Sequence, residues 1–261
     1  MKRQPTSLSR KEIPSQFRSF LDGAAVFDSS CSPAAKVYFL DKGQGYYLKK
    51  SSKGTLAREA ELWKFFHTKG LATEVLGYES SENDWLLTAR ASGEDCIAPM
   101  YLEDPTRLCD TLAYLLRALH ETNPAGCPVP DHTREYFATA RRNYAAGHFD
   151  LDPLFRQWQF SSPEEAMQIA EKNNKYLKTE VLLHGDYCLP NIMLDNWSFS
   201  SFIDLGNGGV GDRHVDLFWG IWSLQFNLKT DAYQQRFLDV YGRDAIEPEV
   251  FRTIAAIEVF G

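Results

Sequence analysis

The stretch HGDYCLPN at residues 184–191, followed by FIDLG at 202–206, carries the strongest signal in this chain. Asp186 lies on a glycine-containing loop directly after an apolar run, and Asn191 follows five residues later. Asp204 ends a second apolar stretch that is typical of a strand. The pattern predicts a carboxylate, an amide and a second carboxylate around a short β-hairpin.

These three side chains suit a specific chemistry. Amide and carboxylate oxygens such as those of Asn191 and Asp204 are hard ligands, which suit Mg²⁺ rather than zinc. Asp186 is then left to accept a proton from an attacking hydroxyl. A loop Asp, an Asn five residues on and a metal-binding Asp on the next strand form the arrangement used in phosphoryl transfer. An isolated HGD triplet would fit a capped loop with solvated carboxylates, but the combined spacing favours catalysis.

The N-terminal part of the chain offers residues that could hold a nucleotide. Lys49 ends a predicted strand and Glu59 lies in the helix predicted after it. A strand lysine held by a helix glutamate and aimed at phosphates belongs to the same arrangement. Alone, each would be an ordinary surface charge. The segment 28–35, which includes Ser32, has no GxGxxG motif, but its small residues and hydroxyls allow backbone N–H groups to approach phosphates.

The predicted elements divide the chain into two parts. Strands are predicted at 37–40, 46–48, 74–78 and 85–88, with one helix over 56–67. Further along, helices are predicted at 108–119, 133–146, 163–177, 214–226, 231–241 and 248–259, and strands at 192–194 and 199–203. We therefore expect an α+β chain with an N-terminal nucleotide-binding lobe over 1–90 and a helical C-terminal lobe over 91–261. A cleft between the lobes is the expected ligand site.

Composition narrows the class of partner and the compartment. A net charge of −7 over 261 residues favours a cationic ligand over nucleic acid or an anionic membrane. The five cysteines form no CxxC pair, which is typical of reduced thiols in a cytoplasmic protein. No apolar stretch approaches the roughly 18 residues of a membrane span, and the first 20 residues lack the apolar region of a signal peptide. We expect a cytoplasmic monomer or weak dimer.

From about Cys31 to its end, the chain resembles the aminoglycoside 3′-phosphotransferase family, which is similar in fold to eukaryotic protein kinases. The motifs that carry the resemblance are SPAAKVY at 32–38, YLK at 47–49, RE at 58–59, HGD…PNIM at 184–193, FIDLG at 202–206 and GVGDR at 209–213 with Asp216 after it. The resemblance implies a two-lobed protein-kinase-like fold, with an antiparallel sheet plus a helix in the N-lobe and a short β-hairpin at the catalytic site of the helical C-lobe. It also implies ATP-dependent transfer of the γ-phosphoryl group to a small-molecule hydroxyl, with the 3′-hydroxyl of an aminoglycoside as first candidate and antibiotic resistance as the consequence.

The resemblance also implies a role for individual residues. Asp186 would be the catalytic base, while His184 braces its loop. Asn191 and Asp204 would bind Mg²⁺. The expected nucleotide contacts are the phosphate-anchoring pair Lys49 and Glu59, the phosphate loop with Ser32, and a hinge that meets adenine through the backbone at Thr88, Ala89 and Ala91.

The acceptor region departs from the family pattern. Family members bind the ammonium groups of aminoglycosides with carboxylates, and Asp150, Asp152 and Glu258 are the expected remaining cation contacts here. The segment 224–227 reads LQFN where the family carries an acidic pair, and Asn207 replaces a common Arg. We therefore expect activity on kanamycin- or neomycin-type aminoglycosides to be weak, narrow or secondary to another acceptor.

Three alternatives remain open on the sequence. The first is a kinase of another small amine- or sugar-containing metabolite, and the second is a non-catalytic nucleotide-binding module of the same fold. The third is a two-metal hydrolase, built from the acids and histidines at His184, Asp186, Asp204, Asp212, His214 and Asp216. The chain lacks the H-x-H or H-E-x-x-H spacing that would support such a metal centre.

Overall fold

The computed structural model describes residues 3–33, 35–149, 158 and 160–261. The chain forms two compact units, one from residues 1–98 with 190–207 and the other from 99–189 with 208–261. These boundaries differ from the expected division at residue 90. The difference arises because strand β7 (Glu94–Asp95) pairs with β9 (Ile192–Asp195), which ties the later hairpin to the first unit.

The first unit is built on a six-stranded sheet in the order β1-β2-β3-β4-β6-β5, and every neighbouring pair is antiparallel. Its strands are β1 (Gln4–Pro5), β2 (Ala25–Asp28), β3 (Lys36–Asp41), β4 (Tyr46–Ser52), β5 (Val75–Ser80) and β6 (Asn83–Ala89). The four strands predicted in this region are all present. The turn between β3 and β4 needs glycine, because Gly43 and Gly45 both have positive φ angles, of 60° and 86°.

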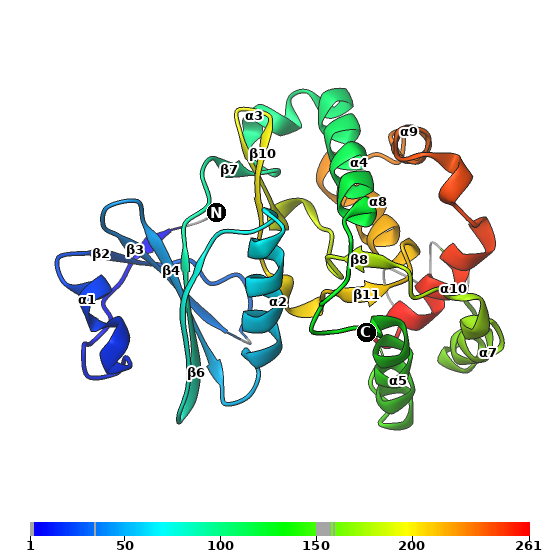
Figure 1. Cartoon of the computed structure of the whole chain (residues 1–261). Helices are drawn as coiled ribbons and strands as arrows, with labels where there is room; N and C mark the ends of the chain where they lie inside the picture. Colours follow the sequence, from blue (N-terminus) through cyan, green and yellow to red (C-terminus); the bar gives the residue numbers. More distant parts are fainter. Residues whose placement is uncertain (1–2, 34, 150–157, 159) are drawn as a thin grey trace. The chain divides into compact units, whose positions relative to one another are not determined.

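The two faces of this sheet have different partners. Leu48 packs into a core with Leu87 and with Phe17 from the N-terminal segment, which contains a 3-10 turn (Ser15–Phe17) and the short helix α1 (Arg18–Leu21). Because side chains alternate along a strand, Lys49 faces the other side, where it meets helix α2 (Ala57–Thr68). Figure 1 shows α2 alongside the sheet. The sequence did not predict the N-terminal turn and helix.

A three-stranded sheet, in the order β10-β9-β7, completes the first unit. Strand β10 (Ser198–Phe202) pairs with β9 through a two-residue turn at Asn196 and Trp197, which have φ angles of 53° and 72°. Positive φ at both central residues is the mark of a tight hairpin turn that follows the twist of its strands. The hairpin predicted from the sequence is confirmed. A 3-10 turn at Leu189–Asn191 precedes it and another at Leu205–Asn207 follows.

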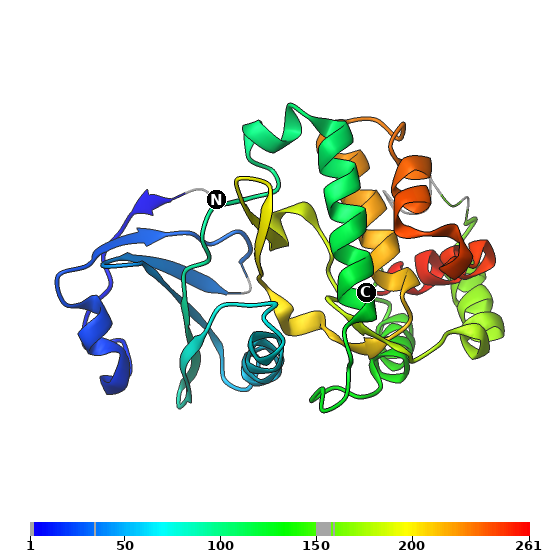
Figure 2. The ribbon, with the colours of Figure 1, turned by 45° about the horizontal axis from the view of Figure 1, so that its top comes forward.

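The second unit is mainly helical. Its helices are α3 (Pro99–Leu102), α4 (Pro105–Glu121), α5 (His132–Ala145), α7 (Pro163–Asn173), α8 (His214–Leu228), α9 (Gln234–Tyr241) and α10 (Pro248–Glu258). Strands β8 (Val181–Leu183) and β11 (Gly209–Gly211) form an antiparallel pair, and 3-10 turns lie at Asn174–Tyr176 and Arg243–Ala245. Helices α4 and α8 lie side by side in both views (Figures 1 and 2).

Local chemistry explains where these helices begin. Asp104 and Asp131 accept hydrogen bonds from the backbone N–H groups three residues on, at 3.1 Å each, and so cap α4 and α5. Ser162 caps α7 in the same way, and Pro163 occupies its first turn. The six helices predicted in this region are confirmed, although α7 ends at Asn173 rather than 177. In the described part of the chain, none of the helices has the length and apolar character needed to cross a membrane.

Candidate active site

Three of the predicted site residues meet in the first unit. The Lys49 ammonium bonds both oxygens of Glu59, at 3.0 and 2.8 Å, and the Oδ1 atom of Asp204 at 2.7 Å. The Glu59 side chain is 5% exposed and that of Asp204 is 54% exposed. The buried carboxylate therefore holds the lysine in place, while the exposed one remains accessible to a ligand.

The charges around Lys49 fix its protonation state. Burial alone would lower the pKa of its ammonium group, but the carboxylates of Glu59 and Asp204 outweigh burial and raise the pKa above the ordinary value. Lys49 thus carries a full positive charge at neutral pH, which suits it to bind anionic groups.

The loop that carries Asp204 is held in an uncommon shape. Asp204 has a φ of +59°, in the left-handed region that residues other than glycine seldom adopt. On either side, the Ile203 N–H donates to the Asn191 carbonyl at 3.0 Å, and the Arg58 Nε donates to the Gly206 carbonyl at 2.9 Å. The structure thus anchors Asp204 to α2 on one side and to Asn191, whose residue surface is 9% exposed, on the other.

Asp186 lies in the second unit, on a loop that other residues brace. The N–H groups of His184 and Gly185 donate to the two carboxylate oxygens of Asp216, at 2.8 and 2.7 Å. The Asp186 N–H donates to Nδ1 of the buried His184 ring at 3.3 Å, so this histidine braces the loop as expected. The sequence analysis did not predict that Asp216 anchors this loop. Its only signal in the sequence was its position three residues after the GVGDR motif.

Glu258, the third expected cation contact, lies in a polar cluster of the second unit. Its Oε1 atom accepts from the Tyr136 hydroxyl at 2.6 Å and from the Trp219 Nε1 at 2.9 Å. Burial, helped by the charge of Asp186, raises the pKa of Glu258 to about 7 despite these donors. The sequence analysis singled out neither Tyr136 nor Trp219. Asp150 and Asp152 lie outside the described residues.

Of the described residues expected to contact the nucleotide in the phosphate loop and the hinge, only one lines the cavity next to Tyr47. Ser32 is exposed. Thr88 is buried within β6, and the Ala89 N–H already donates to the Glu74 carbonyl at 2.9 Å. Ala91, by contrast, lines a cavity of about 150 Å³ together with Tyr47. Of the expected adenine contacts in the hinge, only Ala91 borders this cavity.

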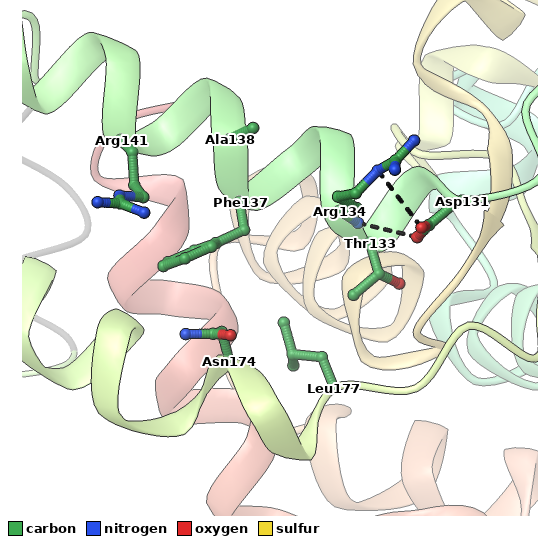
Figure 3. A pocket seen from close by; sticks show the side chains of 8 residues that line it. All are labelled: Asp131, Thr133, Arg134, Phe137, Ala138, Arg141, Asn174 and Leu177. Atoms are coloured by element: carbon green, nitrogen blue, oxygen red, sulfur yellow. Dashed lines mark hydrogen bonds and ion pairs between the residues drawn. The ribbon is translucent and has the colours of Figure 1, made fainter.

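A second cavity, of about 380 Å³, lies in the second unit between α5 and the end of α7 (Figure 3). Phe137 lies on one side of it, on α5, and Asn174 and Leu177 lie on the opposite side. Both arginines that line this cavity already form ion pairs: Arg134 pairs with Asp131, and Arg141 pairs with Glu171. None of the predicted site residues that the structure describes lines it.

The residues of the two-metal alternative are engaged elsewhere. Asp212 accepts from the His214 ring at 2.6 Å and from the Lys178 N–H at 2.7 Å, and Asp216 holds the Asp186 loop. Among the described residues, no group of three His, Cys, Asp or Glu side chains is arranged to bind a metal ion. The geometry therefore gives this alternative no support.

The comparisons with known proteins agree with this geometry. The chain belongs to the phosphotransferase enzyme family, whose model matches residues 29–253. Within that family, it is 45% identical over 252 residues to a probable aminoglycoside 3′-phosphotransferase of Lactococcus lactis subsp. lactis (strain IL1403), with 96% of each chain covered. An aminoglycoside 3′-phosphotransferase of Niallia circulans is 30% identical over 145 residues, which cover 56% of this chain and 55% of that one. The family resemblance predicted from the motifs is confirmed.

Solved structures give the same result for the fold. A type VIII aminoglycoside 3′-phosphotransferase superposes with a TM-score of 0.78 at 24% identity, covering 95% of this chain and all of that one. An aminoglycoside phosphotransferase of Streptomyces rimosus, in complex with ADP and streptomycin, superposes with a TM-score of 0.69 at 24% identity over 87% of this chain and 91% of that one. The predicted α+β, kinase-like fold is confirmed.

Proposed function

We propose that this protein is an ATP-dependent phosphotransferase that moves the γ-phosphoryl group of ATP to the 3′-hydroxyl of an aminoglycoside. One observation supports it above the others: the Lys49 ammonium is bonded to the buried Glu59 and to the exposed Asp204. This cluster is half of the arrangement that kinases use. The relative at 45% identity, a probable aminoglycoside 3′-phosphotransferase, supports the choice of acceptor and of hydroxyl.

The described residues fit a nucleotide and its metal. Lys49 keeps its charge and would bind phosphate oxygens, while Glu59 fixes its position. Asp204 and Asn191 would hold Mg²⁺, because the Asp204 carboxylate is half exposed and both side chains offer hard oxygen ligands. Bound Mg²⁺ would neutralise charge that develops on the phosphates. A solved structure of the same fold contains ADP, which is consistent with ATP as the donor.

Asp186 would accept the proton of the acceptor hydroxyl as it attacks. The anchoring of its loop by Asp216 and His184 keeps its backbone fixed, so no reorganisation is needed during the reaction. Ala91 and Tyr47 border the cavity that we propose for adenine. Ser32, Thr88 and Ala89 remain predicted contacts.

The region expected to bind the acceptor offers fewer carboxylates than the family pattern. Glu258 is the one expected cation contact that the described residues include, and with a pKa of about 7 it is only partly ionised near neutrality. A bound ammonium group would favour its ionised form. Because the segment 224–227 reads LQFN where the family carries an acidic pair, we propose a narrow or weak aminoglycoside range. Another small amine or aminosugar remains the second candidate acceptor.

We further propose that the protein works in the cytoplasm as a monomer or weak dimer, without nucleic acid or membrane partners. Its pI of about 5.4 is consistent with a cationic small-molecule ligand. Expression in a susceptible host would then give modest resistance to the aminoglycosides it phosphorylates.

An ADP-release assay tests the function directly. The purified protein is given ATP, Mg²⁺ and a panel of aminoglycosides, amino alcohols and neutral sugars. The decisive pair is an aminoglycoside with a 3′-hydroxyl and its 3′-deoxy counterpart, which differ in a single oxygen. We expect saturable ADP release with the first and none above background with the second. Equal release with both would contradict the 3′ assignment, and preference for an amino alcohol would support the second candidate. A kcat/KM near the diffusional ceiling of about 10⁸ M⁻¹s⁻¹ would contradict the expected weakness.

A further inference from the structure

A row of hydrogen-bonded, buried side chains begins at Asp216 and extends away from the catalytic loop. Oδ2 of Asp216 accepts from the His184 N–H and also contacts the His120 Nε2 atom at 3.2 Å. On the far side of that ring, Nδ1 contacts the Tyr241 hydroxyl at 2.7 Å. The side chains of His120 and Asp216 are 1% and 0% exposed, so water does not replace these contacts.

The hydrogen-bond directions follow from the chemistry of each group. Burial lowers the pKa of His120, so its ring is neutral and carries one proton. Asp216 accepts from two backbone N–H groups and, as a carboxylate, also accepts from Nε2–H of His120. Nδ1 must then be an acceptor, and the Tyr241 hydroxyl is its donor. Burial raises the pKa of Tyr241 to about 12, which keeps that proton on the oxygen.

At its outer end, this row of side chains finishes in an ion pair near the surface. The Tyr241 oxygen accepts from Nη1 of Arg213 at 3.4 Å, and Arg213 bonds Glu180 through Nη2 at 2.9 Å. The order is therefore Glu180, Arg213, Tyr241, His120, Asp216 and the backbone of the catalytic loop. Helices α4, α8 and α9 each contribute a side chain, which locks all three helices at one point.

On this basis we propose that His120 and Tyr241 are positioning residues for the phosphoryl transfer: they orient Asp216, which in turn holds the peptide groups next to Asp186. The inference rests on the proposed function, since it assumes that Asp186 is the base. Without the Tyr241 hydroxyl, Nδ1 of His120 is buried and unpaired, and a ring rotation or tautomer change removes a donor from Asp216.

Tyr241→Phe tests the proposal, with Phe237→Leu as the control. Phe237 is fully buried on the same helix and packs against Gly220 of α8, but its side chain takes no part in the hydrogen bonds from Glu180 to Asp216. We expect Tyr241→Phe to lower kcat by about fivefold to thirtyfold, with the KM values for ATP and acceptor unchanged. Phe237→Leu should lower the thermal midpoint while kcat stays near normal. Equal kcat losses in both variants would overturn the proposal.

Two measurements without turnover separate this proposal from the proposed function. Hydrogen exchange of the 181–187 segment should speed up in Tyr241→Phe and not in Phe237→Leu; equal rates in the two variants would overturn the positioning role. NMR of the ¹⁵N-histidine-labelled wild type should show His120 protonated on Nε2, and protonation on Nδ1 would overturn the proposal even if no variant folds. If hydrogen exchange speeds up only in Tyr241→Phe but the wild type phosphorylates nothing in the panel, the result supports the positioning role and rejects the proposed function.

Discussion

Asp186 and Asp204 are both aspartates of the predicted site, but they lie in different units and have different partners. Asp186 has a braced backbone in the second unit, whereas Asp204 bonds the Lys49 ammonium in the first. Their substitutions should therefore change different measured quantities, one affecting turnover and the other affecting binding of the nucleotide with its metal.

Asp186→Asn should lower kcat by at least about a hundredfold, the range for loss of a general base. The nucleotide should still bind, because no nucleotide contact is assigned to Asp186. Steady-state kinetics together with calorimetric titration of MgATP measure both effects. Asp239→Asn, an exposed change on α9, is the control. Near-normal turnover of Asp186→Asn would rule out the base assignment.

Asp204→Ala should abolish the Mg²⁺ dependence of ATP binding, because the half-exposed carboxylate would supply the charge that the proposed metal needs. Lys49 keeps Glu59 as its partner, so the fold should persist. Titrating ATP with Mg²⁺ and then with a chelator measures the difference. Asp195→Ala, an exposed change in the same hairpin, should leave it intact. An unchanged metal dependence in Asp204→Ala would place the metal on other residues.

Glu258 should make the protein less stable as the pH rises. The native state holds this proton up to a pKa of about 7, whereas the unfolded chain releases it near the ordinary value of 4.5. Between these values the unfolded state binds fewer protons, so the free energy of unfolding falls with increasing pH. Glu258→Gln should therefore raise the urea midpoint at about pH 8 and change it little at about pH 5. Glu249→Gln, on the exposed face of α10, should not show this difference between the two pH values. A parallel shift at both pH values would show that burial of the charge is not the cause.

At the scale of elements, two glycines with similar backbones provide a matched pair. Gly93 and Gly54 have φ angles of +77° and +85°, so alanine strains both. A Cβ on Gly93 would lie 2.0 Å from the Leu194 carbonyl oxygen, whereas one on Gly54 would meet nothing within 4 Å. Gly54→Ala should thus cost about 1 kcal/mol in unfolding free energy, the cost of a side chain in the left-handed region. Gly93→Ala should cost several times more, because β7 must separate from β9. Similar urea midpoints for the two variants would contradict this.

Local patterns predicted most elements because each depends on neighbours in the sequence. The β9–β10 hairpin and the helix α4 with its apolar stripe are examples. Strand β11 was missed because only three residues, two of them glycine, form it. The N-terminal turn and α1 were missed because their apolar residues, such as Phe17, acquire meaning only through packing on the sheet.

At the scale of the whole chain, spacing predicted which residues would carry the chemistry, but it did not predict the residues that support them. The Lys49–Glu59 pair follows from a strand and the next helix, ten positions apart. The contact of Asp216 with His120 joins residues 96 positions apart, and that of Tyr136 with Glu258 joins residues 122 apart. No local pattern encodes such contacts, so they emerged only from the tertiary structure.

The pairing of β7 with β9 has a consequence for synthesis. About a hundred residues separate the two strands, and at about 5–20 residues per second the ribosome needs on the order of 5–20 seconds to translate that interval. Throughout this wait β7 has no partner strand, and the nascent chain must keep that edge from pairing with other chains. Lys49 and Glu59 are translated early and can already meet, but the residue that completes their cluster, Asp204, is added only after the interval has passed. A nascent chain arrested before residue 190 would therefore carry the lysine with one carboxylate partner instead of two.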